Sequence, residues 1–280
     1  MRVLFTGGNG FIGKNIVPLL RQDHEVLAPS SSELDMRDAN ALRSFIDLHR
    51  IEAIVHSAAA GVSSAGADVF ERNVRMSENV LSCAPFVGRI VLFGSGAEYD
   101  KSKPIVRARE EDAARADPLD DYGRSKLAIS RRAAGIPNAV VLRIFGVFGP
   151  HEDISRRFIS MAILDALRVE PITIRQDVVF SYLWVLDLAP IVNHMIVSPT
   201  ARGAYNVVPD ETVTLTQIAR IVNSVAAAPV DVRVLTPGMN REYTGDNERL
   251  RAEMPDVRFT PLPDAIRILM GQYRTDRRAI

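Results

Sequence analysis

The fold is decided by the stretch Val3-Leu4-Phe5-Thr6-Gly7-Gly8-Asn9-Gly10-Phe11-Ile12-Gly13, a short apolar run followed directly by a glycine-rich turn. Gly7 allows a tight turn, Gly10 lets the backbone approach a pyrophosphate, and Gly13 permits close packing of the next helix on the strand. Phe11 and Ile12 open that helix, whose free N–H groups and positive dipole end attract phosphate. The stretch therefore predicts a dinucleotide-binding turn, and a purely structural glycine turn is the alternative.

Similar apolar, β-branched runs recur along the first half of the chain. They are Val3–Phe5, Glu25–Leu27, Ala53–Val55, Ile90–Phe93 and Ala139–Ile144, with helix-compatible segments between them. This alternation predicts parallel strands joined by crossover helices, that is, an α/β fold with a Rossmann-type doubly wound parallel sheet. Ligands of such sheets bind beyond the carboxyl ends of the strands. We expect the functional site there.

The pattern changes after Pro150, where a helix-like stretch, a strand-like stretch and a Pro- and Arg-containing final third follow. We predict a dinucleotide-binding domain over residues 1–150 and a smaller C-terminal α/β lobe, for the substrate, over residues 151–280. The segment at about 176–200 is expected to return to the first domain.

Composition excludes several classes of function. Apolar residues make up 47% of the chain and charged residues 24%, as is ordinary for a folded protein. The formal net charge is zero without a long run of one sign, so no nucleic-acid partner is expected. Cys83 is the single cysteine, and no stretch approaches the roughly 18 apolar residues of a membrane span. We therefore expect a cytoplasmic protein without a membrane partner, and we predict no metal site.

Two interpretations are open for the arginine-rich end of the chain, Arg274 to Arg278. A phosphate-binding tail is one, and a solvated terminus is the other. We favour the solvated terminus, because the ends of most domains are frayed.

The end of the second strand bears on the choice between NAD and NADP. An acid there binds the adenosine ribose and repels a 2′-phosphate. The chain reads Leu27-Ala28-Pro29-Ser30-Ser31-Ser32, with no acid in the run. Ser30 and Ser31 are candidate phosphate donors, so NADP is favoured over NAD. A serine-rich turn without a ligand role is the alternative.

A second motif, Tyr122-Gly123-Arg124-Ser125-Lys126, places a phenol and an ammonium one helical turn apart, on one face. Hydride transfer to a carbonyl leaves negative charge on oxygen, which an acid must protonate. A phenol does this better when a nearby cation stabilises its phenolate form. Ser95 follows another predicted strand, in Phe93-Gly94-Ser95-Gly96-Ala97, and is a candidate hydrogen-bond donor to the carbonyl. Tyr122, Lys126 and Ser95 are the predicted catalytic residues.

With these motifs the chain resembles the extended short-chain dehydrogenase/reductase family, in its branch of nucleotide-sugar epimerases, dehydratases and reductases. The resemblance covers essentially the whole chain, including Leu142–Pro150 and Leu183–Ala189. It implies adenine contacts from Asp35 and Met36. It also implies further cofactor contacts, beside Tyr122 and Lys126, from Ala58, Ala59, Ala60, Asn73 and Phe145. A homodimer built on paired helices, over about 64–81 and from about Tyr122, is a further implication.

Departures from the family pattern reduce the number of reactions that the chain is expected to catalyse. Dehydratases carry an Asp-Glu pair where this chain has Gly96-Ala97, so dehydration is not expected. Members that invert carbons next to a ketone carry a cysteine where Ala97 stands and a histidine near Ser155-Arg156-Arg157, and both are missing. His151 is expected to be a surface residue. What remains is hydride transfer at one carbon.

These features favour an NAD(P)-dependent reductase of a nucleotide-linked 4-keto-6-deoxy sugar, with Tyr122 as the acid. A nucleotide-sugar C4 epimerase that retains NAD is the alternative, and a non-catalytic dinucleotide-sensing protein is a second.

The residues expected to bind the substrate diphosphate also depart from the family pattern. Gly146 and Phe180 replace the asparagine and arginine that normally hold the substrate diphosphate. Arg156, Arg157, Arg175 and Arg241 are candidate substitutes. The apolar Phe180 also leaves open a small carbonyl substrate without a nucleotide.

Overall fold

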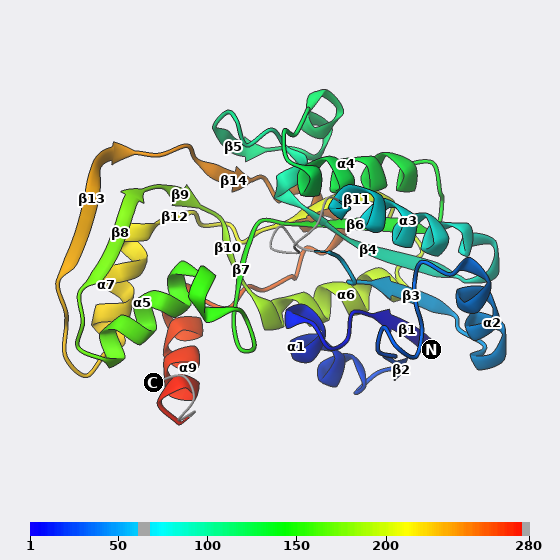
Figure 1. Ribbon diagram of the computed structural model, residues 1–280, viewed down its shortest axis with the longest axis horizontal. Helices are drawn as coiled ribbons and strands as arrows, with labels where there is room; N and C mark the ends of the chain where they lie inside the picture. The colour runs from blue at the N-terminus through cyan, green and yellow to red at the C-terminus, as the bar shows by residue number, and fades with distance from the viewer. Residues whose placement is uncertain (61–67, 276–280) are drawn as a thin grey trace.

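The computed structural model describes residues 1–60 and 68–275. Its centre is a six-stranded sheet in the order β11-β6-β4-β3-β1-β2, and every neighbouring pair is parallel (Figure 1). In chain order these strands are β1 Arg2–Thr6, β2 Glu25–Leu27, β3 Ala53–His56, β4 Arg89–Ser95, β6 Ala139–Ile144 and β11 Gly203–Val207.

Helices cover both faces of this sheet. On one face lie α1 Phe11–Leu20 and α6 Leu188–Val197, and on the other lie α2 Ala39–His49, α3 Val69–Ser82 and α4 Asp121–Ala133. Side chains alternate between the faces: Phe5 packs toward α1 and α6, whereas Leu4 packs toward α2 and α3. A parallel sheet buried on both faces needs nearly continuous apolar strands, as the runs in the sequence provide. The predicted doubly wound α/β fold is confirmed.

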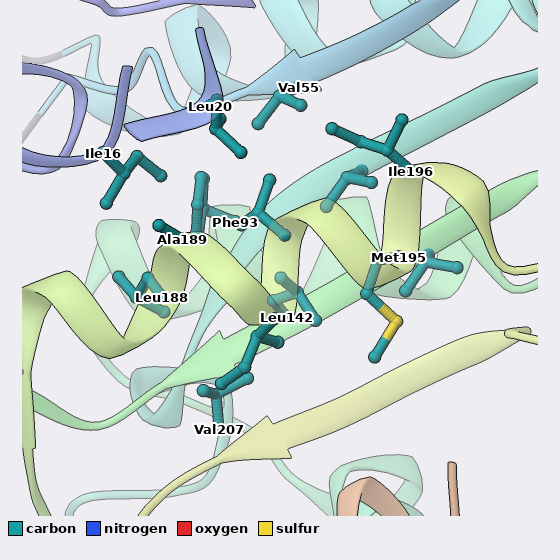
Figure 2. Packing of buried hydrophobic residues seen from close by; sticks show 14 of the residues in the cluster. Ile16, Leu20, Val55, Phe93, Leu142, Leu188, Ala189, Met195, Ile196 and Val207 are labelled. Atoms are coloured by element: carbon teal, nitrogen blue, oxygen red, sulfur yellow. The ribbon is translucent and has the colours of Figure 1, made fainter. Parts of the chain in front are cut away.

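The core between α6 and the sheet is fully apolar. Figure 2 shows Leu188, Ala189, Met195 and Ile196 of α6 facing Phe93, Leu142 and Val207 of the sheet, with Ile16 and Leu20 of α1 beside them. Leu188 and Met195 are fully buried. Burial of one such side chain contributes about 1.5–3 kcal/mol.

The chain changes direction between β1 and β3. From β1 it passes to β2 on one side, and then crosses back to β3 on the other side. At such a switch point the loops after the two strands diverge and leave a crevice at their carboxyl ends. The glycine-rich turn follows β1 at this point, and Ser57 to Ala60 follow β3.

The C-terminal part of the chain has a second apolar core and supplies most strands of three small sheets, to which the part before residue 150 adds β5 and β7 (Figure 1). One sheet has the order β12-β9-β14-β5, another pairs β13 with β8, and a third pairs β10 with β7. The strands are β5 Ile105–Ala108, β7 Gly146–Phe148, β8 Ile172–Asp177, β9 Val179–Phe180, β10 Tyr182–Trp184, β12 Val213–Thr214, β13 Val232–Met239 and β14 Tyr243–Gly245.

The helices of this part are α5 Phe158–Leu167, α7 Leu215–Val225, α8 Glu248–Glu253 and α9 Leu262–Thr275. Short 3₁₀ helices span Ala84–Phe86, Gly96–Glu98, Glu110–Arg115, Ile154–Arg156 and Val185–Asp187. Both α6 and β11 come after residue 150 but lie in the layers of the first sheet. The division of the chain near residue 150 stays a prediction.

Some expectations concern other parts of the chain. The helix predicted over about 64–81 begins at Val69 in the described chain, and residues 61–67 lie outside it. Of the arginine-rich end, residues 276–278 also lie outside the described residues. Among the described helices, none has the length and apolar character that crossing a bilayer requires.

Candidate active site

The glycine-rich turn lies directly against the segment after β3. Gly7 has φ +77°, and a Cβ there would lie 2.8 Å from the backbone N of Ala58. A Cβ on Gly13 would lie 2.5 Å from the carbonyl oxygen of Gly7. Only glycine allows this conformation and these approaches. The bare backbone of the turn forms a cradle of the kind that a dinucleotide pyrophosphate fits.

The N-terminus of α1 has the features of an anion-binding site. Its N-cap is Gly10, which has no side chain to accept from the first N–H groups, and the first turn contains no acid. These N–H groups and the positive end of the helix dipole face the turn. Phe11 and Ile12 line the large cavity described below.

Two buried polar groups hold the segment after β3. The Thr6 hydroxyl lies 2.8 Å from His56 Nδ1 and accepts a hydrogen bond from the Ala58 N–H at 3.3 Å. Burial lowers the pKa of His56 to about 3, and the charge of Lys126 adds to this effect. The imidazole is therefore neutral, and it serves as a rigid support for the cradle.

Asn73, on α3, is one of the predicted cofactor contacts. Its side chain accepts from the Ala60 N–H at 2.7 Å and donates to the Ala60 carbonyl at 3.1 Å. It also donates to Ser125 Oγ at 3.2 Å. Asn73 is almost fully buried. It thus links the segment after β3 to α4, and its amide has no remaining hydrogen-bond donor.

The turn after β2 contains a carboxylate that the sequence interpretation did not anticipate. Ser30 donates from both its backbone N–H and its hydroxyl to Glu33 Oε2, each at 2.7 Å. These two bonds lower the pKa of Glu33, so the carboxylate is ionised. Ser30 Oγ also lies 2.9 Å from Ser32 Oγ, and Ser31 is exposed. Although Leu27 to Ser32 contains no acid, the turn folds one back onto Ser30.

The predicted adenine contacts lie next along the chain. Asp35 forms an ion pair with Arg37 at 2.7 Å, and hydrogen bonds from Arg37 lower the pKa of Asp35 to about 2. Met36 is buried, and its carbonyl accepts from Asn79 of α3 at 2.9 Å. Asp35 lines a separate shallow hollow together with Arg75.

The predicted catalytic residues come from two neighbouring elements. Ser95 ends β4, and its Oγ accepts from the Ala97 N–H at 3.1 Å. Tyr122 lies in the first turn of α4, which Asp120 caps by accepting from the Gly123 N–H at 2.8 Å. Lys126 lies one turn later, with Nζ 5.7 Å from the centre of the Tyr122 ring. The predicted shared face of Tyr122 and Lys126 is present.

The packing of α4 on the Ser95 segment depends on Gly123. A Cβ at Gly123 would lie 2.5 Å from the Ala97 carbonyl oxygen. Lys126 is almost fully buried and donates to the Phe93 carbonyl at 2.7 Å. This hydrogen bond fixes the ammonium beside β4, close to Ser95.

A buried ion pair holds the backbone of Ser95 in place. Glu98 is fully buried and forms an ion pair with Arg143 at 2.6 Å, while its other oxygen accepts from the Ser95 N–H at 2.9 Å. Arg143 also donates to the Tyr99 hydroxyl at 3.1 Å and to the Glu110 carbonyl at 2.8 Å. Breaking a buried pair of this kind costs about 3–5 kcal/mol. Sequence reasoning missed this pair, because no local pattern couples Glu98, in a 3₁₀ helix, to Arg143 on a distant strand.

One cavity of about 1080 Å³ joins these parts. Ser95, Tyr122 and Lys126 line it, as do the predicted cofactor residues Phe11, Ile12, Ala59 and Phe145. Other predicted cofactor residues lie outside its lining, namely Gly7, Gly10, Gly13, Ser30, Ser31, Asp35, Met36, Ala58, Ala60 and Asn73.

The far wall of the cavity is basic. The four arginines proposed from the sequence all line it: Arg156, Arg157, Arg175 and Arg241. Arg156 forms an ion pair with Asp153 at 3.3 Å. Within residues 1–60 and 68–275, the other three form no ion pair. Lys101 and Lys103 add positive charge, against Asp153 and Glu242.

Aromatic side chains form the wall between Ser95 and the C-terminal part. Phe145 is buried and packs between Tyr99 and Tyr243, with ring centres 5.7 Å and 5.0 Å away. Tyr243 also contacts Phe180 edge-on at 5.8 Å. Tyr243 lines the cavity, and sequence reasoning missed it because nothing local in the final third marks it. In the described residues, no cluster of three or more His, Cys, Asp or Glu side chains is arranged to hold a metal ion.

Known proteins resemble this chain in sequence. ADP-L-glycero-D-manno-heptose-6-epimerase of Brachyspira hyodysenteriae is 25% identical over an alignment of 298 residues, which covers 92% of this chain and 93% of that protein. dTDP-4-keto-6-deoxy-D-glucose reductase of Streptomyces niveus is 28% identical over 215 residues, with coverage of 74% and 71%.

The fold has known counterparts as well. GDP-L-fucose synthetase from Naegleria fowleri, solved with NADP bound, superposes with a TM-score of 0.83 over 99% of this chain and 94% of that chain, at 17% identity. Residues 3–208 match the NAD dependent epimerase/dehydratase family. Because this match covers most of the chain, the resemblance is confirmed: the chain belongs to the NAD-dependent epimerase/dehydratase family.

Proposed function

We propose that this protein reduces the keto group of a nucleotide-linked 4-keto-6-deoxy sugar. The observation that carries the proposal is a single cavity lined by Ser95, Tyr122 and Lys126 together with Phe11 and Ile12, the first residues of α1 after the glycine-rich turn. A proton donor, a hydrogen-bond donor and the N-terminus of the helix that follows the turn thus open into the same space. The intact trio also argues against a non-catalytic dinucleotide sensor.

Each of the three residues has a defined task in this reaction. A bound nicotinamide dinucleotide would supply the hydride. Ser95 donates a hydrogen bond to the carbonyl oxygen, and the Tyr122 hydroxyl delivers the proton as negative charge builds on that oxygen. Lys126 stabilises the phenolate that remains on Tyr122, because its ammonium is held close by the Phe93 carbonyl.

The basic wall supports a nucleotide-linked substrate. Arg157, Arg175 and Arg241 form no ion pair among the described residues, and all three line the cavity. Guanidinium groups bind phosphate oxygens in a bidentate manner. We propose that they hold the substrate diphosphate in place of the asparagine and arginine that Gly146 and Phe180 replace. The relative from Streptomyces niveus, named as a reductase of such a sugar, supports the same substrate class.

We propose NADPH as the favoured reductant, on the basis of Ser30 and Ser31. The Glu33 carboxylate opposes this choice, because it already accepts from Ser30 and would repel a 2′-phosphate. The same carboxylate favours a second candidate function, a nucleotide-sugar C4 epimerase that retains NAD. Protein purified with bound NAD would support that candidate.

Further proposals extend from the family resemblance. We propose a homodimer that pairs α3 and α4, which pack side by side on one face of the sheet, with the same two helices of a second copy. We also propose a cytoplasmic location, dinucleotide binding by residues 1–150 with α6 packed on them, and substrate binding by residues 151–280.

The test follows NADPH and NADH oxidation separately over a panel of nucleotide-linked keto-deoxy sugars. Tyr122→Phe removes the proton donor and is expected to lower kcat about 10²- to 10⁴-fold. Tyr205→Phe is the matched control, because its hydroxyl bonds to Arg202 and Glu253 outside the cavity. Absence of oxidation with either cofactor, or full turnover in Tyr122→Phe, would refute the reductase assignment.

A further inference from the structure

Lys101 brings a positive charge to the cavity from the segment between Ser95 and β5. The acid beside it in the chain, Asp100, pairs with Lys103 at 3.5 Å and accepts from the Ser102 N–H at 2.9 Å. Within the described parts of the chain, residues 1–60 and 68–275, Lys101 itself forms no ion pair and no hydrogen bond. Its ammonium is therefore available to a ligand in the cavity.

The Tyr243 ring fixes where this ammonium lies. Lys101 Nζ lies 5.2 Å from the centre of the ring, in a cation–π contact. Tyr243 is on β14, which pairs with β5, and its ring packs against two phenylalanine rings. A Cβ on Gly96, the residue after Ser95, would lie 2.5 Å from the Tyr243 hydroxyl oxygen. The Lys101 ammonium is thus one aromatic ring away from the segment that carries Ser95.

The surroundings of Lys101 favour an anion beside it. Although the residue as a whole is exposed, desolvation lowers the pKa of Lys101, the charge of Asp120 raises it, and that of Arg157 lowers it. The Asp120 carboxylate already accepts from the Gly123 N–H as the N-cap of α4. Arg157 lines the same cavity and forms no ion pair in the described chain. An anion held between Lys101 and Arg157 offsets the repulsion between these two cations.

The order of groups along a nucleotide-linked sugar identifies the anion. Reduction requires the keto carbon to lie beside Ser95 and Tyr122. Beyond the sugar ring comes the sugar-linked phosphate, and the nucleoside-linked phosphate follows it. Arg175 is on β8 and Arg241 follows β13, whereas Lys101 belongs to the segment after Ser95. Lys101 therefore meets the substrate from the side of the reacting carbon, where the sugar-linked phosphate lies.

We propose that Lys101 is a substrate-binding residue that holds the sugar-linked phosphate. Its ammonium donates to the oxygens of this phosphate together with the Arg157 guanidinium, while Arg175 and Arg241 hold the nucleoside-linked phosphate. Lys101 thereby fixes the sugar relative to Ser95. The inference rests on the nucleotide-linked substrate of the proposed function, and its test needs no turnover.

Calorimetry with plain nucleotides tests the assignment. UDP, GDP, CDP, ADP and dTDP, and the corresponding monophosphates, are titrated into the protein with NADP⁺ and NAD⁺ present to fill the dinucleotide site. Lys101→Met keeps most of the stem over the Tyr243 ring and removes the charge. It is expected to raise Kd for the preferred diphosphate about tenfold. Kd for the monophosphate, which lacks the second phosphate, is expected to stay within about twofold.

Two further variants are the controls for this experiment. Lys101→Arg retains the charge and is expected to retain diphosphate binding. Arg109→Gln removes a nearby charge outside the site, because Arg109 is exposed, pairs with Glu248 and does not line the cavity. It is expected to bind both nucleotides as wild type does.

The outcomes separate this assignment from the proposed function. An unchanged Kd for the diphosphate in Lys101→Met, or an equal loss for monophosphate and diphosphate, would overturn the assignment of Lys101 alone. Wild-type protein that binds none of these nucleotides would refute the nucleotide-linked substrate of the proposed function, and the assignment with it.

Discussion

At the scale of single residues, the turn after β2 combines serines that favour NADP with a carboxylate that favours NAD. Serine hydroxyls can donate to a 2′-phosphate, whereas a carboxylate accepts from ribose hydroxyls and repels phosphate. Ser30 and Glu33 are bonded to each other through two contacts of 2.7 Å. A phosphate would have to displace Glu33 from both Ser30 donors. We therefore expect the pair to control how well each dinucleotide binds.

Glu33→Gln tests this control. Removing this exposed charge relieves its repulsion of a nearby phosphate, so KM for NADPH is expected to fall about fivefold relative to KM for NADH. Steady-state kinetics with both cofactors measures the ratio. Glu25→Gln is the control, since Glu25 is an exposed acid at the other end of β2 and pairs with Arg2. An unchanged ratio in Glu33→Gln would exclude this residue from cofactor selection.

At the scale of elements, α5 and α9 are joined by a buried polar chain. The Ser160 hydroxyl of α5 bonds to Glu152 and lies 2.7 Å from the Tyr273 hydroxyl of α9. The second oxygen of Glu152 is buried without a hydrogen-bond partner in the described part of the chain. Burial raises the pKa of Glu152 to about 7. The packing of the two helices thus favours a protonated Glu152.

Stability is expected to depend on pH through this carboxyl. Because its folded-state pKa is raised from 4.5 to about 7, the contribution is complete below about pH 4.5 and is lost as pH rises through about 7. The loss amounts to at most about 3 kcal/mol. Glu152→Gln is expected to flatten the decline of Tm between pH 5 and pH 8, as followed by thermal unfolding, and Glu170→Gln, at an exposed acid beyond α5, is the control. An equal decline in wild type and Glu152→Gln would contradict the assignment.

The elements differ in how far the sequence predicts them. β1, its turn and α1 were predictable, because their signals are local: an apolar run, three spaced glycines and a helix start. Tyr122 and Lys126 were predictable for the same reason, since both belong to one helical turn. The bonds of Glu98 to Arg143 and of Glu33 to Ser30 were not. The first joins a 3₁₀ helix to a strand distant in the sequence, and the second depends on the path of a turn that no periodicity encodes.

At the scale of the whole molecule, the cavity draws its two halves from different parts of the chain. The start of α1 and the three predicted catalytic residues belong to the first sheet and its helices, whereas Arg157, Arg175 and Arg241 come from segments after residue 150. Only the folded chain brings these segments together. The sequence therefore identified these arginines and Arg156 as candidates, but only the structure shows that all of them line one cavity. Tyr243 entered the site in the same way.

This division predicts that substitutions can weaken binding of the nucleotide sugar without weakening binding of the dinucleotide. Arg175→Gln and Arg241→Gln are each expected to raise KM for the nucleotide sugar about tenfold or more, since a charge-assisted bond contributes about 1.5–3 kcal/mol, and to leave KM for the dinucleotide unchanged. Calorimetry with a plain nucleoside diphosphate is expected to show the same loss of affinity. Arg233→Gln is the control, because Arg233 lies on β13 beside β8, pairs with Asp231 and does not line the cavity. If both variants bound the nucleoside diphosphate as wild type does, the diphosphate grip would have to lie elsewhere, and a carbonyl substrate without a nucleotide would become the better assignment.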